Sequence, residues 1–202
     1  MSSLRVAALI MAAGASSRFD GCKLLSDVHG VPMVQSVINQ VHGLVADTFV
    51  VTGAWQQALE SAAQRGALSG ATTIYCASWQ KGLGHSIATG VAKLEPRYDG
   101  ILVLLGDQVA VTSADIRRLL ACLDGHDAAC AVYRGRRGAP AVFGKNCFGL
   151  LKELTGDRGA KTMLYNPALA VAKCDMPHAA IDIDSRPELL RWLNCSDIAP
   201  LL

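Results

Sequence analysis

The chain has little net charge, few aromatic residues and no long apolar run. Its 202 residues include 19 Lys and Arg against 17 Asp and Glu, a formal net charge of +2, and only 5% are aromatic. Without a basic patch interleaved with aromatic side chains, we expect no nucleic-acid partner. No apolar run approaches the roughly 20 residues that a membrane span requires, so we expect no membrane partner either.

The sequence also contains no Cys-x-x-Cys pair. Its seven cysteines are scattered singly, at Cys22, Cys76, Cys122, Cys130, Cys147, Cys174 and Cys195. Such an odd, unpatterned set is typical of reduced thiols in a cytoplasmic protein and argues against a structural zinc site. The alternative is a secretory signal, because an apolar run from Val6 leads to Ala13-Gly14-Ala15, a possible cleavage site. Cleavage there would remove the first predicted strand and the loop that follows it. We therefore interpret the run as a buried strand and not as a secretory signal.

What the chain does have is apolar material for a sizeable core. Hydrophobic residues make up 51% and the mean hydropathy is +0.28. The length and the lack of a linker or repeat predict one domain over residues 1–202. Short aliphatic runs alternate with amphipathic stretches, and the five consecutive aliphatic residues 101–105 indicate a strand buried on both faces. This alternation predicts a doubly wound α/β domain that binds ligands at the carboxyl ends of its strands.

A loop after the first strand carries the strongest chemical signal. The apolar run 4–11 predicts a buried strand, and the loop begins with small residues and ends with two cations. These residues are Ala12, Ala13 and Gly14, followed by Arg18 and Lys23. Small residues let backbone N–H groups approach a polyphosphate, whose charge the cations offset. The spacing is that of neither a Walker A loop nor a dinucleotide fingerprint, which points to nucleotidyl transfer.

Three carboxylates are expected where strands end. Asp107 comes two residues after the aliphatic run 101–105, and Asp182 and Asp184 flank Ile183 at the end of an expected strand 180–183. Residues i and i+2 of a strand point the same way, so both carboxylates would reach one crevice. Mg²⁺ takes one or two protein carboxylates and fills its shell with water and phosphates. The three residues predict a magnesium site; the alternatives are a turn or helix cap at Asp107 and a simple lead into a helix at Asp184.

Two further loops precede expected helices. The segment 82–86 would offer free N–H groups at a helix N-terminus to a phosphate or to the edge of a base. Its candidate nucleotide-binding residues are Gly82, Gly84 and Ser86. The segment 156–161 is charged and flanked by glycine, and either binds an anionic acceptor or is a capping turn. Its candidate acceptor-binding residues are Asp157, Arg158 and Lys161.

In this order the motifs resemble those of the MobA-like nucleotidyltransferases, most nearly the molybdenum cofactor cytidylyltransferase branch. The resemblance runs from residue 4 to about 190 and rests on the loop 12–23, Gly82–Ser86, Leu105-Gly106-Asp107-Gln108, Gly156–Lys161 and Asp182-Ile183-Asp184. It implies a Rossmann-like nucleotidyltransferase fold with three layers (α/β/α), a mostly parallel central sheet, and Mg²⁺ as cofactor. By resemblance, Gly14, Arg18 and Lys23 hold the triphosphate, and Asp107 and Asp184 hold the metal.

The resemblance also bears on the substrates. Ala12-Ala13-Gly14 is typical of the branch that uses CTP, whereas Ala-Gly-Gly is typical of the GTP branch. Two departures stand out. Gly21 comes one place later than in the usual Arg-Met-Gly-x-x-Lys, and Gly138-Ala139-Pro140 replaces a frequent Gly-His-Pro, which bears on the acceptor.

We therefore expect a magnesium-dependent enzyme that transfers CMP from CTP to a phosphorylated small-molecule acceptor, with molybdopterin as the acceptor by resemblance. Lys23, Arg18 and Asp107 are the expected catalytic residues, and a molybdoenzyme would receive the product. The alternatives are GTP as donor, a sugar phosphate as acceptor, or a non-catalytic carrier of the molybdenum cofactor. A carrier has no need of the carboxylates, and a nicotinamide-dependent oxidoreductase would need the missing fingerprint glycines.

Overall fold

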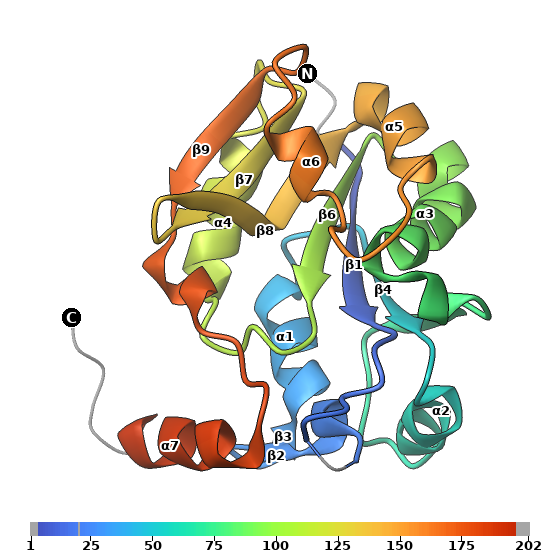
Figure 1. Cartoon of the computed structure of the whole chain (residues 1–202), viewed down its shortest axis with the longest axis vertical. Coiled ribbons are helices and arrows are strands. Elements are labelled where there is room, and N and C mark those ends of the chain that lie inside the picture. Colours follow the sequence, from blue (N-terminus) through green and yellow to red (C-terminus); the bar gives the residue numbers. More distant parts are fainter. Residues whose placement is uncertain (1–3, 20, 197–202) are drawn as a thin grey trace.

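A seven-stranded sheet forms the centre of the computed structural model, which describes residues 4–19 and 21–196, with side chains up to residue 194. The strand order is β5-β4-β1-β6-β8-β7-β9 (Figure 1). The strands are β1 (Val6–Ala12), β4 (Asp47–Thr52), β5 (Thr72–Tyr75), β6 (Gly100–Leu105), β7 (Ala128–Tyr133), β8 (Arg136–Gly144) and β9 (Val171–Asp175). Two short strands, β2 (Asp27–Val28) and β3 (Val31–Pro32), pair separately. In the main sheet β8 runs antiparallel to β6 and β7, and the other described pairings are parallel.

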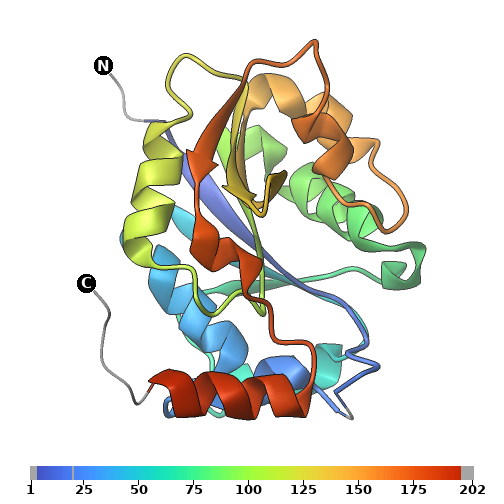
Figure 2. The same cartoon turned by 60° about the vertical axis from the view of Figure 1, so that its left-hand side comes forward.

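Helices cover both faces of the sheet, which confirms the expected three-layer α/β/α fold (Figure 2). One face packs against α1 (Met33–Val41), α2 (Gln56–Gln64) and α4 (Ser113–Ala121). The other packs against α3 (Leu83–Leu94), α5 (Phe148–Lys152) and α6 (Lys161–Leu164). The last helix, α7 (Arg186–Ser196), contributes Leu189 to the first of these two cores. No helix among the described residues is long and apolar enough to cross a lipid bilayer.

Strand β1 lies between β4 and β6 and is buried along its whole length. Its side chains alternate between the two cores: Ala8 and Ile10 pack on the α1 side, and Leu9 and Met11 on the α3 side. Burial on both faces explains why the strand is a continuous apolar run.

The chain reverses its direction of travel across the sheet at β1. It moves from β1 outward through β4 to β5, and then returns through α3 to place β6 on the other side of β1. In open α/β sheets the crevice at such a switch point, at the carboxyl ends of the strands, is where ligands bind. The fold therefore places its binding crevice at the ends of β1 and β6.

The expected strand 180–183 is wrong. After β9 the chain forms a short 3₁₀ helix, η5 (Pro177–Ala180), and then runs through residues 181–184 without pairing to the sheet. Proline cannot donate to a sheet ladder, and aspartate is disfavoured in strands, so this segment leaves the sheet after Met176. The chain reaches the crevice as a connecting segment between η5 and α7.

Candidate active site

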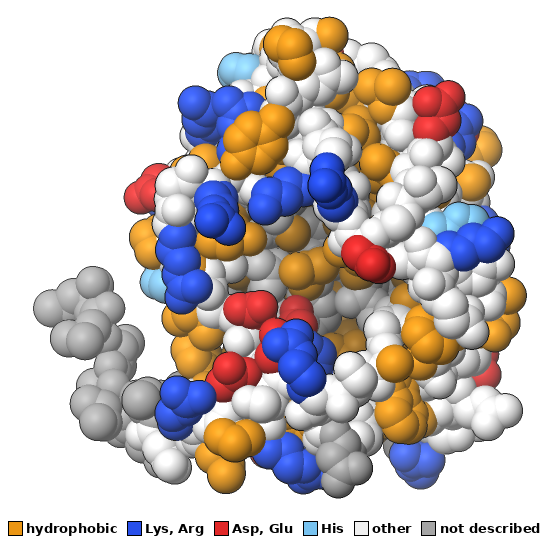
Figure 3. All heavy atoms as spheres, viewed as in Figure 1, with side chains coloured by type: hydrophobic (Ala, Val, Ile, Leu, Met, Phe, Trp, Pro, Cys, Tyr) orange, Lys and Arg blue, Asp and Glu red, His pale blue; other side chains and the backbone are white. Residues whose placement is uncertain are grey.

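A cleft of about 400 Å³ opens at the carboxyl ends of β1 and β6. Figure 3 shows it as a hollow bordered by acidic side chains on one side and by Lys and Arg on the other. Most of the predicted site residues line it: Ala12, Ala13, Gly14, Arg18, Lys23, Gly82, Ser86, Asp107, Asp157 and Asp184. The fold thus brings together residues separated by up to 172 positions, from Ala12 to Asp184.

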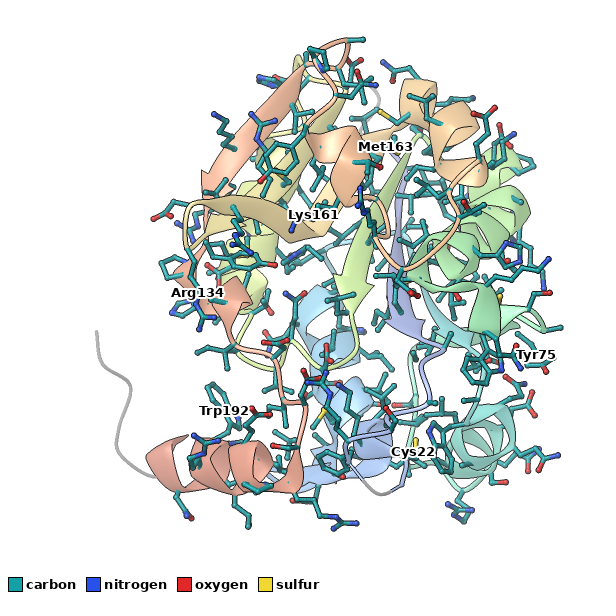
Figure 4. The ribbon with its side chains drawn as sticks, in the orientation of Figure 1. Cys22, Tyr75, Arg134, Lys161, Met163 and Trp192 are labelled. Atoms are coloured by element: carbon teal, nitrogen blue, oxygen red, sulfur yellow. The ribbon has the colours of Figure 1, made fainter. Side chains whose placement is uncertain are left out.

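Four predicted residues do not line this cleft: Gly84, Arg158, Lys161 and Asp182. Arg158 and Lys161 are exposed beside Asp157. Figure 4 shows Lys161 in the upper half of the molecule and Cys22, the neighbour of Lys23, in the lower half. Asp182 is also exposed, two residues from Asp184 on the unpaired segment. The sequence predicted that Asp182 and Asp184 would share one face of a strand, and this prediction is wrong because the segment forms no strand.

The centre of the cleft is an ion cluster around Lys23. Its Nζ donates to Oδ2 of Asp107 at 2.6 Å, to Oδ1 of Asp184 at 3.0 Å and to the carbonyl oxygen of Ile183 at 3.1 Å. The three hydrogens of an ammonium group are thereby all used. Lys23 and Asp107 are largely buried, with 13% and 16% of their side chains exposed, so solvent screens this pair weakly.

Burial and charge act in opposite directions on this cluster. Burial lowers the pKa of Lys23, but the carboxylates of Asp107 and Asp184 outweigh it and raise the pKa above its ordinary value. Burial raises the pKa of Asp184, but the hydrogen bonds and charges of Lys23 and Arg18 lower it overall. The ammonium and the carboxylate of Asp184 are therefore both ionised at neutral pH.

Arg18 extends the cluster toward solvent. Its guanidinium donates to Oδ2 of Asp184 at 2.7 Å, and 73% of its side chain is exposed. An exposed pair of this kind is weak, so the guanidinium is available to an anion that enters the cleft.

The residues present fit a hard divalent cation. Oδ1 of Asp107 is buried and has no hydrogen-bond partner, so a carboxylate oxygen remains available beside Asp184. No group of three or more His, Cys, Asp or Glu side chains in the described part of the chain is arranged to hold a metal. Two carboxylates suit Mg²⁺, which keeps several waters and binds substrate phosphates.

Two residues that follow β4 hold the loop after β1 in place through hydrogen bonds. The carbonyl oxygen of Ala13 accepts a hydrogen bond from the N–H of Ala54 at 3.1 Å, and that of Ala15 accepts one from Nε1 of Trp55 at 3.0 Å.

The shifted Gly21 has a φ of +124°, a conformation that residues with a side chain rarely adopt. A glycine at this position allows the turn between Arg18 and Lys23.

The N-terminus of α3 requires a correction. The N–H of Gly84, expected to be free for a ligand, donates to the carbonyl oxygen of Gly156 at 2.8 Å. A Cβ on Gly84 would lie 2.7 Å from the carbonyl oxygen of Thr155. Gly84 therefore allows the 155–157 loop to pack against α3, and that packing brings Asp157 to the cleft.

Sequence reasoning missed Trp79, on the 3₁₀ helix η2 (Trp79–Lys81), which lines the cleft and is half-buried. Its Cβ and Cγ lie where a side chain on Gly53 would stand. The available signal was a tryptophan three residues before Gly82, in a chain with only three tryptophans.

Fold and site together define a doubly wound α/β protein that gathers a loop of small and basic residues and two carboxylates at one switch point, the place where nucleotide-binding folds of this kind hold their ligands. Residues 8–168 match the family model described as the MobA-like NTP transferase domain. The chain belongs to this family, as its motifs predicted.

Individual relatives agree with this assignment. The chain is 35% identical over 117 residues to the purine catabolism protein PucB of Bacillus subtilis, a match that covers 56% of this chain and 57% of PucB. It thus spans little more than half the length of that curated relative. A nucleotidyl transferase from Methanothermobacter thermautotroptrophicus superposes with a TM-score of 0.79 at 23% identity, over 96% of this chain and 98% of that one. Rv0371c from Mycobacterium tuberculosis H37Rv, in complex with manganese, gives a TM-score of 0.75 at 22% identity, over 94% and 98%. At these identities the two structures support the fold.

Proposed function

We propose that this protein is a Mg²⁺-dependent cytidylyltransferase that transfers CMP from CTP to the phosphate of molybdopterin. The observation that carries the proposal is the cluster of Lys23, Asp107 and Asp184 in the cleft at the ends of β1 and β6. It combines a cation for a triphosphate with two carboxylates for a metal. Membership of the MobA-like family supports nucleotidyl transfer, and Ala12-Ala13-Gly14 supports CTP as the donor.

The reaction requires positioning and charge neutralisation more than covalent participation by the protein. An oxygen of the acceptor phosphate attacks the α-phosphorus of CTP in line. A new P–O bond forms while the bond to the oxygen that leads to the β-phosphate breaks, and pyrophosphate leaves with that bonding pair. Lys23 and Arg18 stabilise the negative charge that develops on the leaving group. Mg²⁺, held by Asp107 and Asp184, neutralises phosphate charge when bound.

The remaining cleft residues have separate roles in this proposal. Trp79, Gly82 and Ser86 border the part of the cleft beside α3 and hold the nucleoside. Asp157 lines the cleft at the loop 155–157, and the exposed Arg158 and Lys161 next to it attract the anionic acceptor. Partial burial, and after it the charges of Asp184 and Asp107, raise the pKa of Asp182. Because Asp182 does not line the cleft, its expected place among the metal ligands is not part of this proposal.

The test is pyrophosphate release by the purified protein with Mg²⁺, molybdopterin and each nucleoside triphosphate in turn. We expect release with CTP and molybdopterin together, and none when either is omitted. Release with GTP, or with a sugar phosphate in place of molybdopterin, would replace the donor or the acceptor in the proposal. No release with any pair would overturn catalysis and favour a carrier of the cofactor.

The proposal extends to the place of the protein in the cell. A cytidylylated cofactor is delivered to a molybdoenzyme, which we include as the receiving partner. The six cysteines whose side chains are described are all free thiols, which supports a cytoplasmic location.

A further inference from the structure

Gln108 directly follows Asp107 and is buried, with only 3% of the residue exposed. Its Nε2 donates to the carbonyl oxygen of Ala139 at 2.9 Å and to that of Ala179 at 3.0 Å. A side-chain amide has two N–H donors, so both are used. Its Oε1 is buried without a hydrogen-bond partner. The orientation of the amide is therefore fixed by two carbonyl groups of the main chain.

These two carbonyls belong to segments 31 and 71 residues away in the sequence. Ala139 lies in β8, and Ala179 lies in η5, five residues before Asp184. One side chain thus joins the end of β6, which carries Asp107, to the segment that carries Asp184. Because Ala139 takes part through its main chain, this contact does not depend on the side chain at position 139.

This segment makes further polar contacts toward α7, within the cleft and at η5. Toward α7, the N–H of Asp184 donates to Oε2 of Glu188 at 2.9 Å. Within the cleft, Asp184 and the carbonyl of Ile183 are bound by Lys23 and Arg18. A triphosphate competes for both of these cations. At η5, the exposed ring of His178 contacts Asp115 at 3.1 Å, a contact open to solvent. Gln108 makes a buried polar contact with η5 that a nucleotide leaves intact, because Gln108 does not line the cleft.

We propose that Gln108 is a positioning residue that keeps Asp184 at a fixed distance from Asp107 when Lys23 and Arg18 turn to the nucleotide. This proposal rests on the proposed function, since the separation of the two carboxylates matters if they share a metal. Loss of a residue that orients a metal ligand typically lowers metal affinity or activity about 10–100-fold. The effect falls on the metal and the chemical step, and nucleotide affinity is retained.

Two variants of the full-length protein test this role. Gln108→Glu keeps the size of the side chain but places a carboxylate against two carbonyl oxygens, and Gln108→Met removes polarity at similar length. Mn²⁺ binding is measured by electron paramagnetic resonance in the presence of a non-hydrolysable CTP analogue, together with kcat and KM for CTP. We expect Mn²⁺ affinity and kcat to fall about 10–100-fold in both variants, with KM within about twofold of the parent.

Gln35→Glu is the matched control. Gln35 is 7% exposed; its amide bonds Asn39 within α1 and joins the helix to the main chain of Ser69, away from the cleft. The same substitution there costs stability and leaves Mn²⁺ affinity and kcat within about threefold of the parent.

Each outcome decides the proposal. Gln108 variants that bind the analogue and also bind Mn²⁺ as tightly as the parent would overturn it. Variants that fail to bind the analogue would show that Gln108 only maintains the fold, which also overturns it. A parent protein that binds no Mn²⁺ with the analogue would instead overturn the proposed function, and this inference with it.

Discussion

The ammonium nitrogen of Lys23 lies 2.6 Å from Oδ2 of Asp107. A metal ion bound by the same carboxylate would therefore lie close to the positive charge of this lysine. A lysine and a divalent cation repel each other at this distance, and both are attracted to Asp107 and Asp184. Metal binding should therefore depend on the movement of Lys23 toward a phosphate. Competition between Lys23 and the metal for the same two carboxylates thus couples metal binding to nucleotide binding within this one cluster.

Removing the charge of Lys23 should separate the two binding events. In Lys23→Met we expect the affinity for Mn²⁺ alone to rise about tenfold or more, because a unit charge several ångströms away no longer opposes the cation. The affinity for CTP should fall in the same variant. Mn²⁺ titration by electron paramagnetic resonance, with and without nucleotide, measures both effects. Lys93→Met, on the exposed side of α3, is the control. Unchanged Mn²⁺ affinity in Lys23→Met would contradict the competition.

The two neighbouring aspartates should differ in importance. Asp184 lines the cleft and binds Lys23 and Arg18, whereas Asp182 is exposed and does not line it. We expect Asp184→Asn to lower kcat about 10²–10³-fold, the usual effect of losing one electrostatic contact in the transition state. Asp182→Asn should lower it much less, by less than about tenfold. Steady-state pyrophosphate release measures both, and equal losses would show that the two carboxylates act together.

Trp79 should contribute to nucleoside binding through its ring. Base–aromatic contacts are worth about 1–3 kcal/mol per base when the aromatic residue is replaced by alanine. We expect Trp79→Ala to raise KM for CTP by roughly tenfold or more and to change kcat little, because the hydrogen bonds that join Lys23 to Asp107 and Asp184 do not involve Trp79. Trp79→Phe keeps an aromatic face and should lie close to the parent. Steady-state kinetics separates the two parameters, and a loss confined to kcat would exclude this role.

The sequence predicts the strand ends of the site well and the loops between them poorly. Asp107 follows a continuous aliphatic strand, and Lys23 follows the loop after another, so the topology of a parallel sheet brings them together. Asp184 was also predicted, but through an expected strand that does not form. Its side chain is bound over long sequence distances by Lys23 and Arg18, contacts that no local pattern records.

The glycines of the segment 82–86 illustrate the same limit. The sequence marks a flexible helix N-terminus, which is equally consistent with a ligand site and with close packing. Only the structure reveals that the 155–157 loop occupies the space at Gly82 and Gly84. Trp79 was missed because an aromatic residue in a loop has no motif that distinguishes a cleft wall from a core residue.

This packing can be tested with two helical glycines. In Gly84→Ala the new Cβ would lie 2.7 Å from the carbonyl oxygen of Thr155, so the loop must move. We expect a loss of about 1–3 kcal/mol in the free energy of unfolding, the usual cost of overpacking. Gly149→Ala, in α5, meets no atom within 4 Å and should be neutral or stabilise by up to about 1 kcal/mol. Urea unfolding of both variants measures the contrast, and equal effects would contradict it.

Asp115 should make stability depend on pH below neutrality. Burial raises the pKa of this carboxyl, but hydrogen bonds from Thr112, His178 and Arg118 outweigh it and lower the pKa from 3.8 to about 2. A depressed pKa means that the ionised group stabilises the fold above its ordinary value, and that this contribution is lost as the pH falls from 3.8 toward about 2. The shift corresponds to about 2 kcal/mol.

We therefore expect Asp115→Asn to be less stable than the parent by about 2 kcal/mol at neutral pH, with the gap closing as the pH approaches 2. Urea unfolding across this pH range provides the measurement. The carboxyl is 4% exposed and also accepts the N–H of Thr112 at the start of α4, so the asparagine keeps part of the cap but none of the charge. A gap that stays constant down to pH 2 would assign the loss to packing and not to the ionised carboxylate.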